Sequence, residues 1–154
     1  MNHLQEHKIW LLKLNEEISI FLDSLMKNNS RYSFFPAKKG LTDYGAKLEL
    51  GFSCYALKTK YIINNLDMDY VSGWSDYLNS FQKKSNIFPR NSFIDDNFIN
   101  FHNEFNFNKT LKNNIKKLLN KTGLYKYITD EEGLQNFIKA ESKQAISSLY
   151  EINK

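Results

Sequence analysis

Apolar residues recur along most of this chain at the three- and four-residue intervals of an amphipathic α-helix, and no segment shows sustained strand-like alternation. We therefore predict about six helices. Their expected ranges are 3–27, 43–64, a short segment from 72 to 81, 96–107, 110–122, and a last helix that follows Thr129. The predicted fold is an all-α domain of antiparallel helix pairs, arranged as a toroid-like arc or as an irregular bundle.

The first two predicted helices carry more apolar surface than one neighbour can cover. On the first, a heptad-like stripe is widened past half of the circumference by Ile9, Trp10, Leu12, Ile20, Leu22 and Met26. The second, with Thr42 as its expected N-cap, has two apolar rows, Tyr44–Leu48–Phe52–Tyr55–Ile62 and Leu50–Cys54–Leu57–Tyr61. We expect the second helix to be central and the first to leave an exposed apolar edge.

Local signals set several boundaries. Thr129-Asp130-Glu131-Glu132 has the pattern of a capping box, and Gly123 is a natural end for the fifth helix. On that fifth helix we expect four apolar side chains to be buried, namely Leu111, Ile115, Leu118 and Leu119. The segments 31–40 and 85–96 contain proline and read as extended connections.

Composition places the chain among globular proteins. Its 154 residues are 42% hydrophobic and 25% charged, which fits one domain over residues 1–154. The net charge of +4 is mild and favours a solvated surface over a polyanion-binding one. The single cysteine excludes an internal disulfide. No apolar run reaches the ~20 residues of a membrane span and no secretory signal is evident, so we expect a cytoplasmic protein.

Two short patterns suggest catalysis or metal binding, and both have simpler explanations. His3-Leu4-Gln5-Glu6-His7 matches the H-x-x-E-H pattern of inverted zinc peptidases, but it lies where a helix frays and no third ligand is marked. Cys54 and His102 would form a nucleophile–base pair if they met, yet each sits among apolar residues typical of a core. We predict no catalytic residue, metal or cofactor from these patterns.

Two acids occupy helix faces that otherwise look buried, Glu49 and Glu141. Burial raises the pKa of a carboxyl group towards the range used in proton transfer. With Tyr44 and Phe52 they would line an interior ligand pocket between helices. We favour the structural alternative, in which each acid forms an ion pair with a nearby Lys or Arg or lies at a rim.

The fifth predicted helix is rich in lysine, with Lys112, Lys116, Lys117 and Lys121 on its outer face. Such a row can contact phosphates or an acidic partner. No recognised nucleic-acid motif accompanies it, so we favour a solvated helix face.

Three stretches together resemble bacterial helical (α/α) toroid proteins related to prenyltransferases and squalene cyclases. They are 34–45, 74–82 leading to Phe93-Ile94-Asp95, and 139–145. The resemblance implies paired outer and inner helices, and this chain would be the N-terminal part of a longer toroid. The Asp-rich motif of the cyclases and the His/Cys/Asp zinc set of the protein prenyltransferases are missing, so their chemistry is not implied.

Taken together, the sequence favours a non-catalytic helical interaction module, or the N-terminal part of a larger toroid-like protein, with a protein partner or a second copy at its apolar edge. The alternatives are an enzyme or ligand binder with an acid-lined pocket, and a weak binder of nucleic acid or acidic partners through the lysine-rich helix.

Overall fold

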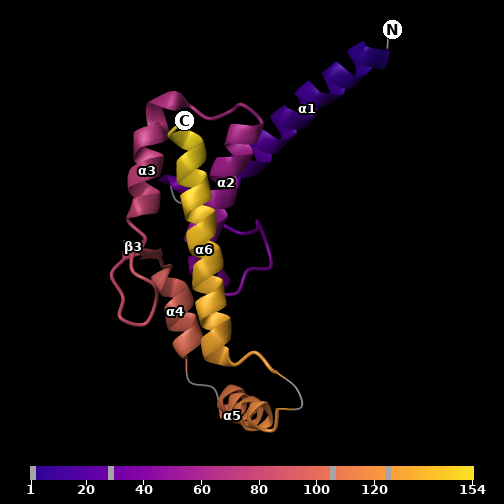
Figure 1. Cartoon of the computed structure of the whole chain (residues 1–154). Helices are drawn as coiled ribbons and strands as arrows, with labels where there is room; N and C mark the ends of the chain where they lie inside the picture. The colour runs from indigo at the N-terminus through magenta and orange to yellow at the C-terminus, as the bar shows by residue number, and fades with distance from the viewer. Residues whose placement is uncertain (1–2, 28–29, 105–106, 124–125) are drawn as a thin grey trace.

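A computed structural model describes residues 3–27, 30–104, 107–123 and 126–154. Within them the chain forms six α-helices, two short 3-10 helices and two two-stranded sheets (Figure 1). The α-helices are α1 (His3–Asp23), α2 (Leu50–Ile62), α3 (Val71–Asn79), α4 (Asp96–Asn103), α5 (Phe107–Lys121) and α6 (Asp130–Ile152). The domain is thus mostly helical, but the expectation of an all-α fold is corrected by the two sheets.

Each sheet is a small antiparallel hairpin that follows a helix. β1 (Met26–Lys27) pairs with β2 (Ser30–Phe34), and β3 (Gln82–Lys83) pairs with β4 (Ser92–Phe93). The first hairpin ends the predicted first helix early, at Asp23 rather than Lys27. These strands are too short to show the alternation from which a strand is recognised in a sequence.

The centre of the body is the pair α2 and α6, which run in the same direction. Gly51 lies beside Glu141, and further along Lys58 Nζ donates to Ser147 Oγ at 3.0 Å. The predicted antiparallel pairing is therefore wrong for these two helices, although α3 runs back alongside them (Figure 1). The parallel arrangement is possible because α2 and α6 are joined through about 70 residues of intervening chain.

The hydrophobic core lies between α2, α6, α3 and the first hairpin. Its most buried side chains, with at most 1% exposure, include Phe34, Leu50, Cys54, Leu57 and Leu78. Aromatic rings pack along one side of the core. The ring of Tyr32 is edge-on to that of Trp74, at 5.2 Å between ring centroids. The Tyr32 hydroxyl lies where a Cβ on Gly73 would be, so this ring packs on the bare backbone of α3.

Two helices project from opposite ends of this body (Figure 1). In Figure 1, α1 leaves it near the C-terminal end of α6, and α5 lies near the start of α6. Only the C-terminal part of α1 packs on the core, through Ile18 and Leu22. The apolar residues of α5 that we predicted to be buried are exposed, at 50% for Leu111, 49% for Ile115, 66% for Leu118 and 40% for Leu119. Helical periodicity marks an apolar face, but it does not say that a neighbour covers it.

None of the described helices is long and apolar enough to cross a lipid bilayer.

Candidate functional site: an acid cluster at the start of α2

The buried carboxylate of Asp95 accepts hydrogen bonds from backbone amides at the starts of two helices. Its side chain is N-cap of α4, accepting from the Asn97 amide at 3.0 Å. Its other oxygen accepts from the amides of Glu49 at 2.7 Å and Leu50 at 3.2 Å, at the start of α2. The side chain is only 3% exposed, so these amide donors take the place of the water that would otherwise solvate it.

This contact explains why α2 begins at Leu50 and not at Asp43 as predicted. Thr42 Oγ1 accepts from the amide of Gly45, which is the first residue of a short 3-10 helix, η1 (Gly45–Lys47), and not of α2. The orphan amides of α2 are satisfied by a residue 45 positions later in the chain. Glu49 consequently lies at the N-cap position and not within the helix.

Glu49 lies beside a buried cation. Lys27 Nζ, on β1, is 3.7 Å from Glu49 Oε1 and donates to the Leu48 carbonyl at 2.8 Å. Burial lowers the pKa of Lys27, and the charges of Glu49 and Asp95 oppose that effect. The hydroxyl of Tyr77 donates to Glu49 Oε2 at 3.4 Å. Glu49 thus has the structural ion-pair environment that we favoured from the sequence.

Glu141 is the third acid at this site and has a different environment. It projects from α6 onto the first turn of α2, where a Cβ on Gly51 would be 2.6 Å from its Oε1. Among the described residues no hydrogen-bond donor or cation pairs with this carboxylate. Burial, and secondarily the charge of Asp95, raise the pKa of Glu141 to about 7. The group can therefore take up or release a proton near neutral pH.

The other two residues expected around this site lie apart from the Glu141 carboxylate. Tyr44 precedes η1 and is 36% exposed; its hydroxyl donates to Glu104 and its ring packs on Phe101. Phe52, on the first turn of α2, is half-buried against the core. In the structure Asp95 lies between the two acids: it accepts from the Glu49 amide, and its charge acts on Glu141. The search for candidate site residues in the sequence missed Asp95 and Lys27. The resemblance did include Asp95, in its Phe-x-Asp stretch.

Cys54 is a core residue in this structure. It is fully buried, and burial raises the pKa of its thiol to about 12 while Ser148 interacts with it from α6. A thiol with so high a pKa has almost no thiolate at neutral pH and is a poor nucleophile. His102 lies on α4, with its ring tilted by 36° against that of Phe98 at 6.4 Å between centroids.

The H-x-x-E-H stretch at the start of α1 holds no cluster of ligands. His3 Nδ1 lies 3.6 Å from Glu6, and both side chains are exposed. Within residues 3–27, 30–104, 107–123 and 126–154, no three His, Cys, Asp or Glu side chains are close enough to hold a metal ion.

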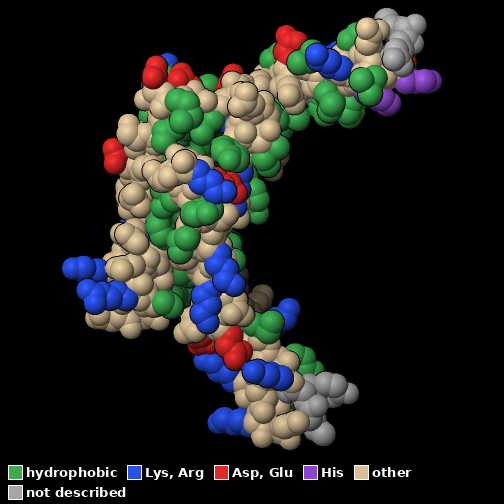
Figure 2. Space-filling view, turned by 45° about the horizontal axis from the view of Figure 1, so that its top comes forward, with side chains coloured by type: hydrophobic (Ala, Val, Ile, Leu, Met, Phe, Trp, Pro, Cys, Tyr) green, Lys and Arg blue, Asp and Glu red, His purple; other side chains and the backbone are tan. Residues whose placement is uncertain are grey.

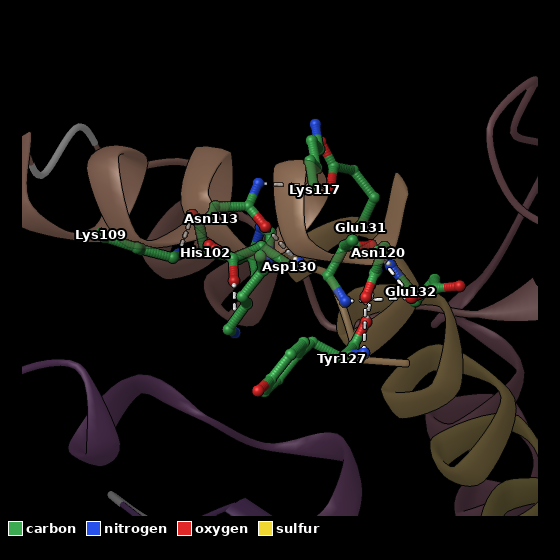
Figure 3. Close-up of polar contacts among 11 residues, drawn as sticks. His102, Lys109, Asn113, Lys117, Asn120, Tyr127, Asp130, Glu131 and Glu132 are labelled. Carbon is green, nitrogen blue, oxygen red and sulfur yellow. Dashed lines mark hydrogen bonds and ion pairs between the residues drawn. The ribbon is translucent and has the colours of Figure 1, made fainter. Parts of the chain in front are cut away.

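Two of the lysines on α5 are engaged by the acidic start of α6 (Figure 3). Lys117 Nζ lies 2.6 Å from Glu131, and Lys116 Nζ lies 3.5 Å from Asp130. Asn113 accepts from the Asp130 amide at 2.9 Å, which adds a direct link between the helices. Lys112 and Lys121 remain exposed. The Lys117 contact and backbone amides lower the pKa of Glu131 to about 2.

These geometries were compared with known proteins. No family model, curated protein or solved structure matches the chain. The resemblance to helical toroid proteins therefore stays a prediction from the sequence.

Proposed function

We propose that this protein is a helical interaction module that associates with a second copy of itself through α1. The observation that carries the proposal is the exposure of apolar side chains along this projecting helix (Figure 2). The exposed fractions are 79% for Leu4, 57% for Ile9, 59% for Trp10, 51% for Leu11, 61% for Leu12, 62% for Ile20 and 52% for Phe21. So many exposed large apolar side chains on one helix are typical of an interface.

Only part of this surface extends the core contact. Leu4 and Leu11 continue the side of α1 on which Ile18 packs, whereas Ile9 and Ile20, three turns apart, lie on the opposite side. A helix with apolar residues on opposite sides needs a neighbour on each side. The body supplies one neighbour, and the proposed second copy supplies the other.

Charge along α1 favours a second copy in antiparallel orientation. The first part of the helix holds Lys8 and Lys13 against one acid, Glu6, and the second part holds Glu16, Glu17 and Asp23 without a lysine. Within one copy Lys13 lies 3.8 Å from Glu17, and both side chains are exposed. When two copies run antiparallel, the lysines of each face the glutamates of the other. Parallel copies would place like charges together, which destabilises pairing.

Sedimentation equilibrium over a range of protein concentrations tests the proposal. We expect a dimer that dissociates on dilution, and a monomer for the double variant Leu12→Glu/Ile20→Glu. The matched control is Ile62→Glu/Ile146→Glu, which changes two exposed apolar residues on α2 and α6 and leaves the dimer intact. A wild-type protein that is monomeric throughout would contradict the proposal.

Charge reversal tests the orientation. Lys8→Glu/Lys13→Glu and Glu16→Lys/Glu17→Lys should each weaken self-association, and the two variants mixed together should form a heterodimer. Weakening without recovery on mixing would contradict the antiparallel orientation.

A further inference from the structure

A cleft of about 670 Å³ lies where the end of α1, the first hairpin and the connection from α2 to α3 meet. Its sides come from Asp23, Arg31, Lys60 and Asp67, and the rings of Tyr70 and Trp74 border it. The volume falls within the range of small-molecule sites, and charged groups beside apolar and aromatic ones are typical of their lining. These residues lie outside the α1 surface and the acid cluster described above.

Three of the four charged groups in the cleft already have partners. Lys60 Nζ lies 3.0 Å from Asp23 Oδ1, so these two charges offset each other. Asp67 caps the 3-10 helix η2 (Met68–Tyr70) by accepting from the Asp69 amide at 3.1 Å. Arg31 is different, because among the described residues no carboxylate lies within ion-pair distance of its guanidinium.

Arg31 is nevertheless held in position. Its guanidinium lies over the ring of Tyr70, 4.1 Å from the centroid, which is cation–π geometry. This stacking uses the face of the guanidinium and leaves its edge, with five N–H donors, available to a ligand. A stacked arginine loses less side-chain freedom on binding a ligand than a free one does. Its edge N–H donors match the oxygens of a carboxylate or a phosphate.

We propose that this cleft binds a small organic anion whose carboxylate or phosphate group is held by Arg31. The apolar part of the ligand lies against Met26 and Leu66, which also line the cleft. Because Asp23 offsets Lys60 and Asp67 accepts from the Asp69 amide, Arg31 is the cation that remains to select an anion over a neutral molecule. The inference goes beyond the proposed self-association and does not depend on it.

Trp74 provides the signal with which binding can be measured. The chain has two tryptophans, Trp10 and Trp74, so the variant Trp10→Phe leaves only the one that borders the cleft. We would titrate this variant with phenyl phosphate, 3-phenylpropionate, inorganic phosphate and the neutral 2-phenylethanol, following Trp74 emission. The two phenyl-bearing anions should give saturable changes and compete with each other. Whichever anion binds more tightly identifies the preferred headgroup.

The second arginine of the chain offers a charge-matched control. Arg31→Gln should weaken binding of both anions about tenfold or more, corresponding to the loss of one charge-assisted contact. Arg90→Gln removes the same charge from an exposed loop and should leave binding unchanged. Equal weakening by both variants, equal binding of 2-phenylethanol, or no saturable change up to about 10 mM ligand would each overturn the proposal.

Discussion

The carboxylate of Glu141 occupies the space that a side chain at Gly51 would need. A Cβ there would be 2.6 Å from Oε1, a distance that two non-bonded heavy atoms do not tolerate. The Glu141 carboxylate can therefore lie against the first turn of α2 because Gly51 has no side chain. Sequence propensity alone would disfavour glycine here, since alanine is up to about 1 kcal/mol better in a helix.

We predict that Gly51→Ala destabilises the protein by about 1–2 kcal/mol, because the new methyl group displaces the Glu141 carboxylate. In a Glu141→Ala background the same change should instead stabilise by up to about 1 kcal/mol. Urea unfolding of the four proteins completes the double-mutant cycle. An effect of Gly51→Ala that is the same in both backgrounds would show that the two residues are not coupled.

The raised pKa of Glu141 predicts a specific dependence of stability on pH. Because the folded state holds the proton more tightly than the unfolded chain, Glu141 favours folding most below its ordinary pKa of 4.5. That contribution is lost as pH rises towards the folded value of about 7. Between about pH 5 and pH 8 we expect a loss of roughly 1–3 kcal/mol from this group.

Glu141→Gln should remove that loss, so the variant should be more stable than wild type at about pH 8 and nearly equal to it at about pH 5. The measurement is urea unfolding at several pH values. Asp76→Asn, which removes an exposed carboxylate from α3, serves as the charge-matched control. A constant difference between wild type and Glu141→Gln across this range would rule out a raised pKa.

Replacement of Asp95 by asparagine should be costly despite the equal size of the two side chains. One amide oxygen cannot serve both the Asn97 amide and the paired amides of Glu49 and Leu50, so a buried donor loses its acceptor. We expect a loss of about 2–4 kcal/mol, measured by denaturant unfolding. Asp96→Asn, at the exposed neighbouring position, should cost less than about 1 kcal/mol.

The ion pair between Lys117 and Glu131 should contribute little to global stability. Both side chains are about half exposed, and exposed pairs are typically worth less than about 1 kcal/mol. Lys117→Gln should therefore lower the free energy of unfolding by about 0.5 kcal/mol or less, and less still at high salt. A larger effect in thermal unfolding would mean that α5 is joined to the body mainly through this contact.

Features encoded by neighbouring residues were predictable from the sequence. The capping box of Thr129 and Glu132 forms as expected, and α5 ends near Gly123, which has a φ of +72°. Six helices were expected and six are found among the described residues. The interactions that set these helix ends join residues only a few positions apart in the chain.

Features that depend on distant residues were not predictable. The start of α2 was wrong because Asp95 supplies its cap, and the burial of Leu111 and Leu118 was wrong because no neighbour covers α5 there. In the candidate site, the position of Glu141 on an apolar stripe did indicate an unusual acid. The participation of Lys27 required knowing that β1 passes beside α2, which no local pattern shows.

The double capping role of Asp95 also bears on how this protein loses its structure. If the segment around β4 opens, α2 and α4 lose their N-terminal acceptor at the same moment, although they are far apart in the chain. Backbone amides at the two helix starts should then exchange with deuterium as one cooperative unit and at similar rates. A single carboxylate would in this way couple the local unfolding of two helices.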